Sequence, residues 1–373
     1  MSLSVGIVGL PNVGKSTLFN ALTKKQQAAA ENYPFCTIEP NSAIVEVRDD
    51  RLEKLAEIVS PQQIIRATVE FTDIAGLVKG ASKGEGLGNK FLANIRECDA
   101  ILHVVRCFEN DDIIHVQEGG NKSAPISPVD DAEVIETELA LADLEQLQRR
   151  HDRFAKEAKA DPKKRPEADA MAALMKHLEE GHPVRTFPRA EGDPIMPVLR
   201  ELHFLTDKPV IYCANVSDDD VTGESNPHVA ALKAYAESQG CAFVVICAQM
   251  EADLAGLSED EAKEFLASYG LSESSLDRTI ALAYKTLGLA SFLTAGPKEV
   301  RAWTFRRGWK APQCAGVIHT DFEKGFIRAQ VVSYDDYVKH GGESGARSAG
   351  ALRPEGKEYE MQDGDVVEFM FSK

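Results

Sequence analysis

The segment at residues 9–17 reads GLPNVGKST and constrains this chain more than any other feature. It fits the pattern G-x-x-x-x-G-K-[ST], a glycine-rich turn between a strand and a helix whose backbone N–H groups surround phosphates. An apolar run precedes it at residues 5–8, and a helical pattern starts at Thr17. We therefore predict a nucleoside triphosphate site in which Lys15 reaches the β- and γ-phosphates and Ser16 helps to hold Mg²⁺. The predicted phosphate-binding residues are Asn12, Val13, Gly14, Lys15, Ser16 and Thr17.

Composition narrows the class of protein. The 373 residues have room for two or three domains, and the net charge of −17 disfavours indiscriminate electrostatic coating of nucleic acid. Seven scattered cysteines without metal-type spacing favour free thiols in a reducing cytosol. No apolar stretch approaches the ~20 residues of a membrane span, and the start of the chain does not resemble a signal peptide. We expect a soluble, cytoplasmic protein that does not bind membranes.

Short apolar strands alternating with helices predict a doubly wound, mostly parallel α/β domain. The predicted strands of this domain are residues 5–8, 43–47, 68–72, 101–107, 210–214 and 242–247. The second and third are rich in β-branched residues, and they could pair as an antiparallel edge on the parallel sheet.

A different pattern interrupts this domain. Apolar residues recur at alternating spacings of four and three over residues 140–158, and a second helical run spans residues 168–178. The polar turn at residues 161–166 contains Pro162 and separates the two runs. We predict an inserted α-helical coiled-coil hairpin; two ordinary helices packed on the core are the alternative. Further strands at residues 300–305, 326–332 and 366–371, with glycine-rich turns between them, predict a small C-terminal α+β domain.

Two segments match the switch regions of P-loop enzymes. Asp73 and Gly76 form a D-x-x-G at the tip of a strand, where the carboxylate can hold a Mg²⁺-bound water and the Gly76 N–H can contact a γ-phosphate. Thr37 lies in a polar loop where a switch threonine would meet Mg²⁺; an ordinary loop threonine is the alternative. Leu77 stands where many GTPases place a glutamine that orients water, and leucine can form no such hydrogen bond.

The base-recognition segment departs from the guanine signature. GTPases carry N-K-x-D after a late strand, and this chain has Asn215, Val216, Ser217 and Asp218, so Val216 replaces the lysine. The chain resembles the Obg-like ATPase family, in particular its YchF group. The resemblance rests on this segment and on the motifs at residues 9–17, 32–41, 73–90, 106–110, 298–303 and 319–326.

The resemblance implies domains and a nucleotide preference. The implied ranges are 1–130 with 200–288 for an OBG-type G domain, 131–199 for the helical insertion and 289–373 for a ubiquitin-like β-grasp (TGS) domain. It implies ATP in preference to GTP, which the family associates with N-x-x-E. Asp218 stands where the family has glutamate, so GTP remains an alternative, and Asp219 or Asp220 could shift the register.

The resemblance also implies catalytic and binding roles. The family has a histidine that is regarded as catalytic, and His115 matches its position; a surface loop histidine is the alternative interpretation. Lys15 is the second predicted catalytic residue. Asn12 matches the P-loop asparagine of relatives that K⁺ stimulates, which implies K⁺ as a further cofactor. Ribosome or ribosomal RNA contact is implied, with neither membrane nor sequence-specific DNA binding, and the protein is expected to be a monomer. The predicted function is a ribosome-associated, Mg²⁺-dependent ATPase switch. A translational GTPase using Asp218, or a nucleotide-dependent binding module with slow hydrolysis, are the alternatives.

Overall fold

The protein is described by a computed structural model that covers residues 3–30, 41–74, 87–110 and 126–372.

The chain divides into two compact units. The first consists of Met1–Ala43 and Glu70–Thr279, and the second of Ile44–Val69 and Ile280–Lys373. The second unit therefore contains a segment from the N-terminal third of the chain. The three domain ranges derived from the resemblance are a different division, and they stay a prediction.

A six-stranded sheet in the order β2-β4-β1-β5-β6-β7 organises the first unit, and the chain passes between the two units within β2 and β4. Its strands are β1 (Ser4–Val8), β2 (Ser42–Glu46), β4 (Thr68–Asp73), β5 (Ala100–Arg106), β6 (Val210–Asn215) and β7 (Ala242–Ile246). Strands β4, β1, β5, β6 and β7 are mutually parallel. Backbone hydrogen bonds from Val47 to Ala67 and from Asp73 to Asn41 make β2 antiparallel to β4. The predicted mostly parallel sheet with an antiparallel edge is confirmed.

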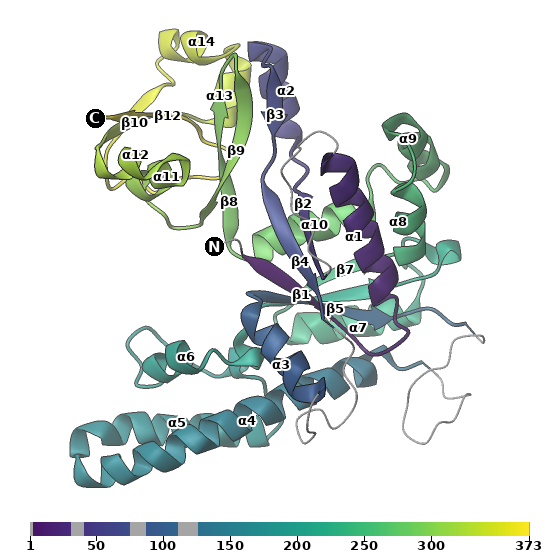
Figure 1. Cartoon of the computed structure of the whole chain (residues 1–373), viewed down its shortest axis with the longest axis vertical. Helices are drawn as coiled ribbons and strands as arrows, with labels where there is room; N and C mark the ends of the chain where they lie inside the picture. Colours follow the sequence, from purple (N-terminus) through teal and green to yellow (C-terminus); the bar gives the residue numbers. More distant parts are fainter. Residues whose placement is uncertain (1–2, 31–40, 75–86, 111–125, 373) are drawn as a thin grey trace. The chain divides into compact units, whose positions relative to one another are not determined.

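Helices cover both faces of this sheet. Every residue of β5 and β6 is buried, as expected for central parallel strands enclosed by helices. In Figure 1, α3 and α7 lie on one side of the sheet and α1 and α8 on the other. The helices are α1 (Lys15–Ala30), α3 (Leu87–Glu97), α4 (Pro128–Ala160), α5 (Arg165–Glu179), α6 (Met196–Leu202), α7 (Pro227–Ser238), α8 (Ala248–Leu254), α9 (Glu259–Ser268) and α10 (Ser275–Thr286), which crosses into the second unit.

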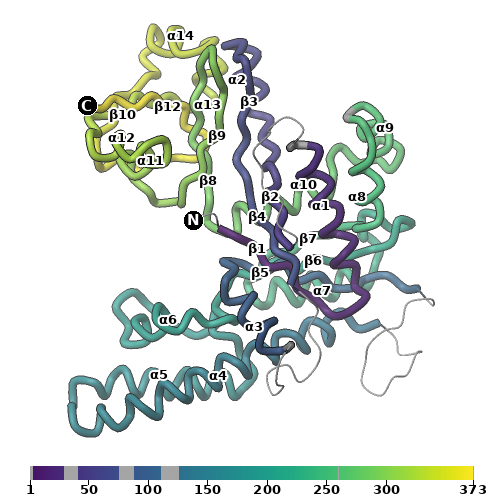
Figure 2. The backbone as a smooth tube through the Cα atoms, in the orientation of Figure 1, coloured from purple at the N-terminus to yellow at the C-terminus, as the bar shows by residue number. Residues whose placement is uncertain are grey.

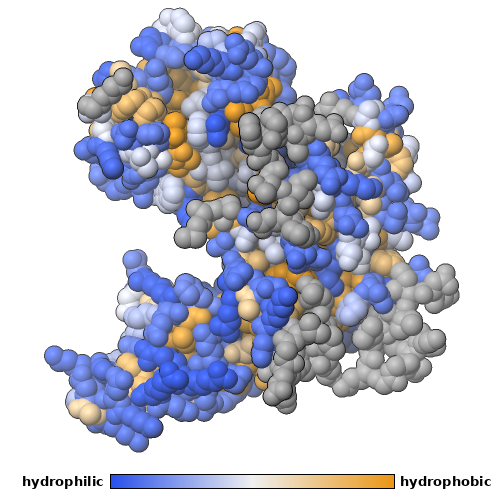
Figure 3. Space-filling model, viewed as in Figure 1, coloured by the Kyte–Doolittle hydropathy of each residue, from blue (hydrophilic) through white to orange (hydrophobic). Residues whose placement is uncertain are grey.

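The predicted hairpin is formed by α4 and α5, which lie side by side and antiparallel (Figures 1 and 2). Their contact buries Leu147, Met171 and Leu174 completely. Helix α4 ends at Ala160, and a short 3-10 turn over Pro162–Lys164 reverses the chain. The visible outer surface of the hairpin carries mainly hydrophilic residues (Figure 3). These features confirm the long helical insertion predicted from the apolar spacing.

A buried aspartate on α4, Asp143, forms hydrogen bonds that hold this helix against the rest of the first unit. The Asp143 carboxylate is fully buried and accepts hydrogen bonds from the backbone N–H groups of Leu205 (2.9 Å) and Thr206 (2.8 Å). It also accepts one from the Thr206 hydroxyl (2.7 Å). Burial raises the pKa of Asp143 to about 6, and the hydrogen bonds from Thr206 and Leu205 oppose that shift.

The second unit contains a mixed sheet in the order β11-β10-β12-β8-β9-β3. Its strands are β3 (Gln63–Ile65), β8 (Leu289–Ala295), β9 (Glu299–Arg306), β10 (Phe326–Val332), β11 (Arg353–Glu355) and β12 (Val366–Phe371). Its helices are α2 (Asp50–Val59), α11 (Ala311–Ile318), α12 (Thr320–Lys324), α13 (Tyr334–Lys339) and α14 (Glu343–Ser348). The apolar core joins Phe292, Phe305 and Phe369 to Cys314 on α11. The predicted C-terminal α+β domain is confirmed. Its sheet is mixed, and β3 extends that sheet beside β9.

No helix in the described ranges is long and apolar enough to cross a membrane.

We predict that Asp143→Ala lowers the free energy of unfolding by about 2–4 kcal/mol, because three buried donors lose their acceptor. Urea denaturation followed by circular dichroism measures the change. Asp152→Ala, on an exposed part of the same helix, is the matched control and should change stability by no more than about 0.5 kcal/mol. Equal effects of the two substitutions would contradict the anchoring role of Asp143.

Candidate nucleotide site

The loop at residues 9–14 connects β1 to α1 and requires glycine at two places. A Cβ atom on Gly9 would lie 2.4 Å from the Val104 carbonyl oxygen, and one on Gly14 would lie 2.2 Å from Asn215 Nδ2. Gly14 and Asn12 also have positive φ angles, of 97° and 63°. The backbone thus turns sharply at the carboxyl end of β1 and enters α1 at Lys15.

Lys15 is folded back onto this loop. Its ammonium group donates hydrogen bonds to the carbonyl oxygens of Gly9 and Leu10, both at 2.8 Å, and the residue is only 9% exposed. Burial lowers the pKa of Lys15 to about 8, and the Asp73 carboxylate opposes this shift. The cation is therefore held at the loop in a partly desolvated state.

Asp73 lies at the end of β4, which is paired with β1 so that Asp73 is in register with Ile7. Its Oδ1 atom is buried and has no hydrogen-bond partner among the described residues. Burial raises the pKa of Asp73, and the charge of Lys15 lowers it. Ser16 is exposed at the start of α1. A hydroxyl and an unpartnered carboxylate oxygen are ligand types that suit Mg²⁺ or its bound water.

A cavity of about 580 Å³ extends from the loop toward the carboxyl ends of β5, β6 and β7. This is the edge at which ligands bind in open α/β sheets. The predicted residues in its lining are Asn12, Gly14, Lys15, Ser16, Thr17, Asn215, Val216, Ser217 and Asp218. The structure therefore brings the phosphate loop and the predicted base-recognition segment together around one space. Val13 is buried just outside the lining.

Asn215 lines the cavity and is also hydrogen-bonded to the protein backbone. Its Nδ2 donates to the Val13 carbonyl oxygen (2.9 Å), and its Oδ1 accepts from the Ala248 backbone N–H (3.0 Å). These two hydrogen bonds join the phosphate loop to the start of α8. The Asn215 residue that forms them is only 4% exposed. Val216 is also buried, and its N–H donates to the Ile246 carbonyl oxygen. Asp218 is exposed and lines the cavity, and its side chain has no hydrogen bond to another described residue.

Sequence reasoning missed five residues that line the cavity: Phe108, Glu109, Asn110, Ala248 and Gln249. The first three follow β5, and Arg106 holds them. Its guanidinium donates to the carbonyl oxygens of Phe108 (2.9 Å) and Asn110 (3.0 Å) and lies 4.8 Å from the centre of the Phe108 ring. Their place after a predicted parallel strand was the available signal.

Three predicted site residues, Thr37, Gly76 and His115, lie outside the described residues, as does Leu77.

Two parts of the chain match known protein families. Residues 4–138 match a family described as "50S ribosome-binding GTPase". Residues 289–372 match the YchF GTPase C-terminal family, which is described as a protein of unknown function.

Full-length relatives extend these matches. The chain is 51% identical to "Ribosome-binding ATPase YchF" of Bacillus subtilis and 52% identical to the protein of that name from Escherichia coli O157:H7, in each case over 100% of both chains. It is 44% identical to "Obg-like ATPase 1" of Xenopus laevis, over 100% of this chain and 93% of that protein. The solved "Structure of the Schizosaccharomyces pombe YchF GTPase" superposes with a TM-score of 0.86 at 37% identity, covering 99% of this chain and 98% of that one. The family resemblance predicted from the motifs is confirmed, and the chain belongs to the YchF group of Obg-like ATPases.

Proposed function

We propose that this protein is a ribosome-associated, Mg²⁺-dependent ATPase that acts as a nucleotide switch. The observation that carries the proposal is the single cavity lined by the phosphate loop, Lys15 and the segment from Asn215 to Asp218. The relatives from B. subtilis and E. coli, which match over the full length, are named as ribosome-binding ATPases. The substrate is ATP and the products are ADP and phosphate.

The phosphates would bind at the loop over the start of α1. Backbone N–H groups there and the positive end of the helix dipole favour an anion. Lys15 would exchange its hydrogen bonds with the Gly9 and Leu10 carbonyl oxygens for bonds to the β- and γ-phosphates. Because its ammonium group is already partly desolvated, this exchange costs less than desolvating a lysine from water.

We expect Mg²⁺ to be held by Ser16 and Thr37 directly and by Asp73 through water. The unpartnered, buried Oδ1 of Asp73 supports this assignment, because a metal-bound water would supply its missing donor. When bound, Mg²⁺ neutralises charge on the β- and γ-phosphates. We extend the proposal to K⁺ stimulation through Asn12.

Hydrolysis would be slow without a partner. Leu77 cannot orient the attacking water, so that role falls to another group, which we propose to be His115. The Gly76 N–H would contact the γ-phosphate. A binding module that uses slow hydrolysis only to reset itself has the same residues, so stimulation by ribosomes distinguishes the two functions.

Base recognition would depend on Asp218 together with Asn215, whose Nδ2 carries two N–H donors and uses one of them for the Val13 carbonyl oxygen. A carboxylate can accept a hydrogen bond from the adenine amino group or two from the adjacent N–H groups of guanine. GTP is therefore the second candidate substrate. Without a lysine at position 216, we expect ATP to bind more tightly.

Competition between ATP and GTP for the purified protein tests the base assignment. We expect ATP to displace a fluorescent nucleotide at lower concentration than GTP does. Asp218→Ala should weaken GTP binding about tenfold and ATP binding less, because guanine loses two charge-assisted hydrogen bonds. Asp219→Ala tests the shifted register, and Glu224→Ala, exposed outside the cavity, is the control. Strong preference for GTP would overturn the ATP assignment.

The pKa of Lys15 predicts how nucleotide affinity depends on pH. Phosphate binding favours the protonated lysine, so affinity is fully present below the free-state pKa of about 8 and is lost as pH rises above it. We expect the dissociation constant to rise about tenfold per pH unit above that value. Lys15→Arg should remove this dependence, since arginine stays protonated. A dissociation constant that is flat from pH 7 to about 9.5 would contradict the prediction.

Ribosome co-sedimentation with and without nucleotide tests the proposed partner. We expect ribosome binding to depend on which nucleotide is bound. We also expect the rate of ATP hydrolysis, measured beside that of GTP, to rise about tenfold or more when ribosomes are added. Lys15→Ala should abolish the stimulated hydrolysis. Persistent ribosome binding without any stimulation would favour the binding module, and no binding in any nucleotide state would refute the ribosome assignment.

A further inference from the structure

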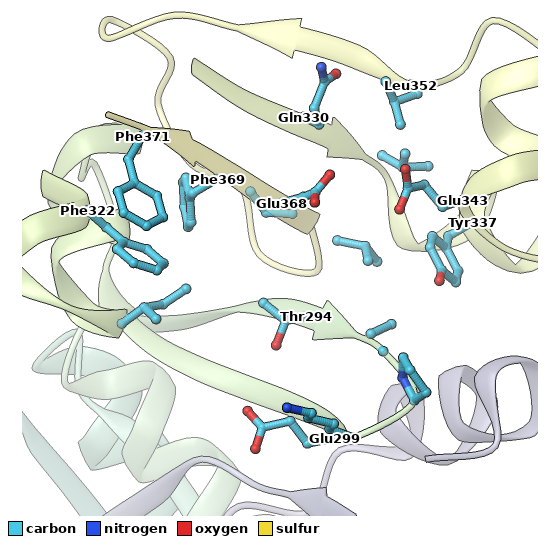
Figure 4. Close-up of a pocket in the computed structure, with 18 residues that line it drawn as sticks. Thr294, Glu299, Phe322, Gln330, Tyr337, Glu343, Leu352, Glu368, Phe369 and Phe371 are labelled. Atoms are coloured by element: carbon cyan, nitrogen blue, oxygen red, sulfur yellow. The ribbon is translucent and has the colours of Figure 1, made fainter. Parts of the chain in front are cut away.

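The second unit contains a cavity of about 580 Å³ that plays no part in the nucleotide site. It lies between β12 and the turn that joins β8 to β9, and we call it the β8–β12 slot (Figure 4). Figure 4 shows Thr294 and Glu299 on the β8–β9 side, and Glu368 and Phe369 on the facing strand β12.

The slot exists because two neighbouring strands part. Strands β8 and β12 share one register pair, Leu293 with Val366, whereas β10 and β12 share six. Strand β8 ends at Ala295 and turns back into β9, while β12 continues to Phe371. The later part of β12 thus has a strand on its β10 side and the slot on its β8 side. Such an open strand edge can pair with an added chain.

One end of the slot is aromatic. Phe322 and Phe371 stack with ring centres 3.9 Å apart, and Phe369 lies beside them (Figure 4). This end can accept an apolar side chain from a bound ligand, and its removal from water would favour binding.

Away from that end, apolar residues and three carboxylates line the slot. Glu299, Glu343 and Glu368 line it, and Lys298 is the one cation among the lining residues. Glu343 is paired with Arg347, while Glu299 accepts a hydrogen bond only from the neutral amide of Gln63 among the described side chains. The Glu368 side chain has no hydrogen bond or ion pair among the described residues, although its backbone lies in the β10–β12 ladder. Glu299 and Glu368 therefore favour a cationic ligand, and they disfavour the phosphates of a nucleic acid.

We propose that the β8–β12 slot binds an extended, basic peptide segment of a partner protein by strand addition. The backbone of the segment lies along β12, one apolar side chain enters the aromatic end, and a lysine or arginine faces Glu368 and Glu299. Strand addition uses main-chain hydrogen bonds for affinity and alternate side chains for specificity, which matches a slot with an aromatic end and carboxylates away from it. This site is separate from nucleotide hydrolysis and does not depend on it.

The full-length protein carries a reporter for this site. The chain has two tryptophans, and the indole N–H of Trp303 donates to the Thr294 hydroxyl (3.0 Å), which lines the slot. Trp309→Phe leaves Trp303 as the sole tryptophan. The probe is a capped peptide of about seven residues that alternates lysine and valine, and the reference peptide alternates glutamate and valine.

We expect a saturable change in Trp303 emission with the lysine peptide and none with the glutamate peptide. Glu368→Lys should weaken binding about tenfold, whereas Glu360→Lys, an equal charge change at an exposed position outside the slot, should leave it unchanged. Glu368→Gln should give an intermediate loss, and unchanged ATP binding and thermal unfolding show that the variants are folded.

Three results would overturn the proposal. The first is no saturable change with the lysine peptide. The second is equal weakening by Glu368→Lys and Glu360→Lys, which would indicate general charge attraction. The third is displacement of the peptide by an oligouridylate, which would assign the slot to nucleic acid.

Discussion

The nucleotide site depends on the buried carboxamide of Asn215. It joins the Val13 carbonyl of the phosphate loop to the Ala248 N–H at the start of α8, so segments more than two hundred residues apart are fixed at one point. The contact is possible because Gly14 has no Cβ, which would lie 2.2 Å from Asn215 Nδ2. Loss of the amide would leave two buried backbone groups unpaired, at a cost of about 1–3 kcal/mol each. The phosphate end and the base end of the cavity thus have a common fixed point.

The same cavity contains the residues that we propose to select the base. Asn215 and the exposed Asp218 line it, together with residues that follow β5. Phe108 and Asn110 are held there by the buried Arg106. We expect both the absence of a lysine at position 216 and the lining residues after β5 to affect the preference of the cavity for adenine or guanine.

Local sequence patterns predicted much of this fold. The features that depend on pairing between distant segments could not be predicted from the sequence. The glycine loop, the strand periods and the apolar spacing of α4 and α5 are local signals, and they identified the sheet and the hairpin. The addition of β3 to the sheet beside β9 pairs residues 63–65 with residues 299–301. A strand of one exposed and two half-buried residues carries no pattern that reveals this partner. At the site, spacing identified Asn215 but not the direction of its amide, because Ala248 becomes its partner only in the folded sheet.

The same strand that fixes the phosphate loop also fixes the helical insertion. Asn215 ends β6, and Tyr212, three residues earlier, donates its hydroxyl to Glu136 on α4 (2.9 Å). Tyr235 donates to the same carboxylate oxygen (3.0 Å), and Arg185 pairs with the other. Glu136 is half-buried. A partly desolvated charge that is paired and hydrogen-bonded contributes more to a unique orientation than to net stability, because its desolvation offsets much of the attraction. Strand β6 therefore sets the direction of the hairpin relative to the phosphate loop, and a nucleotide-dependent change in the hairpin would have to break or carry along the Glu136 contacts.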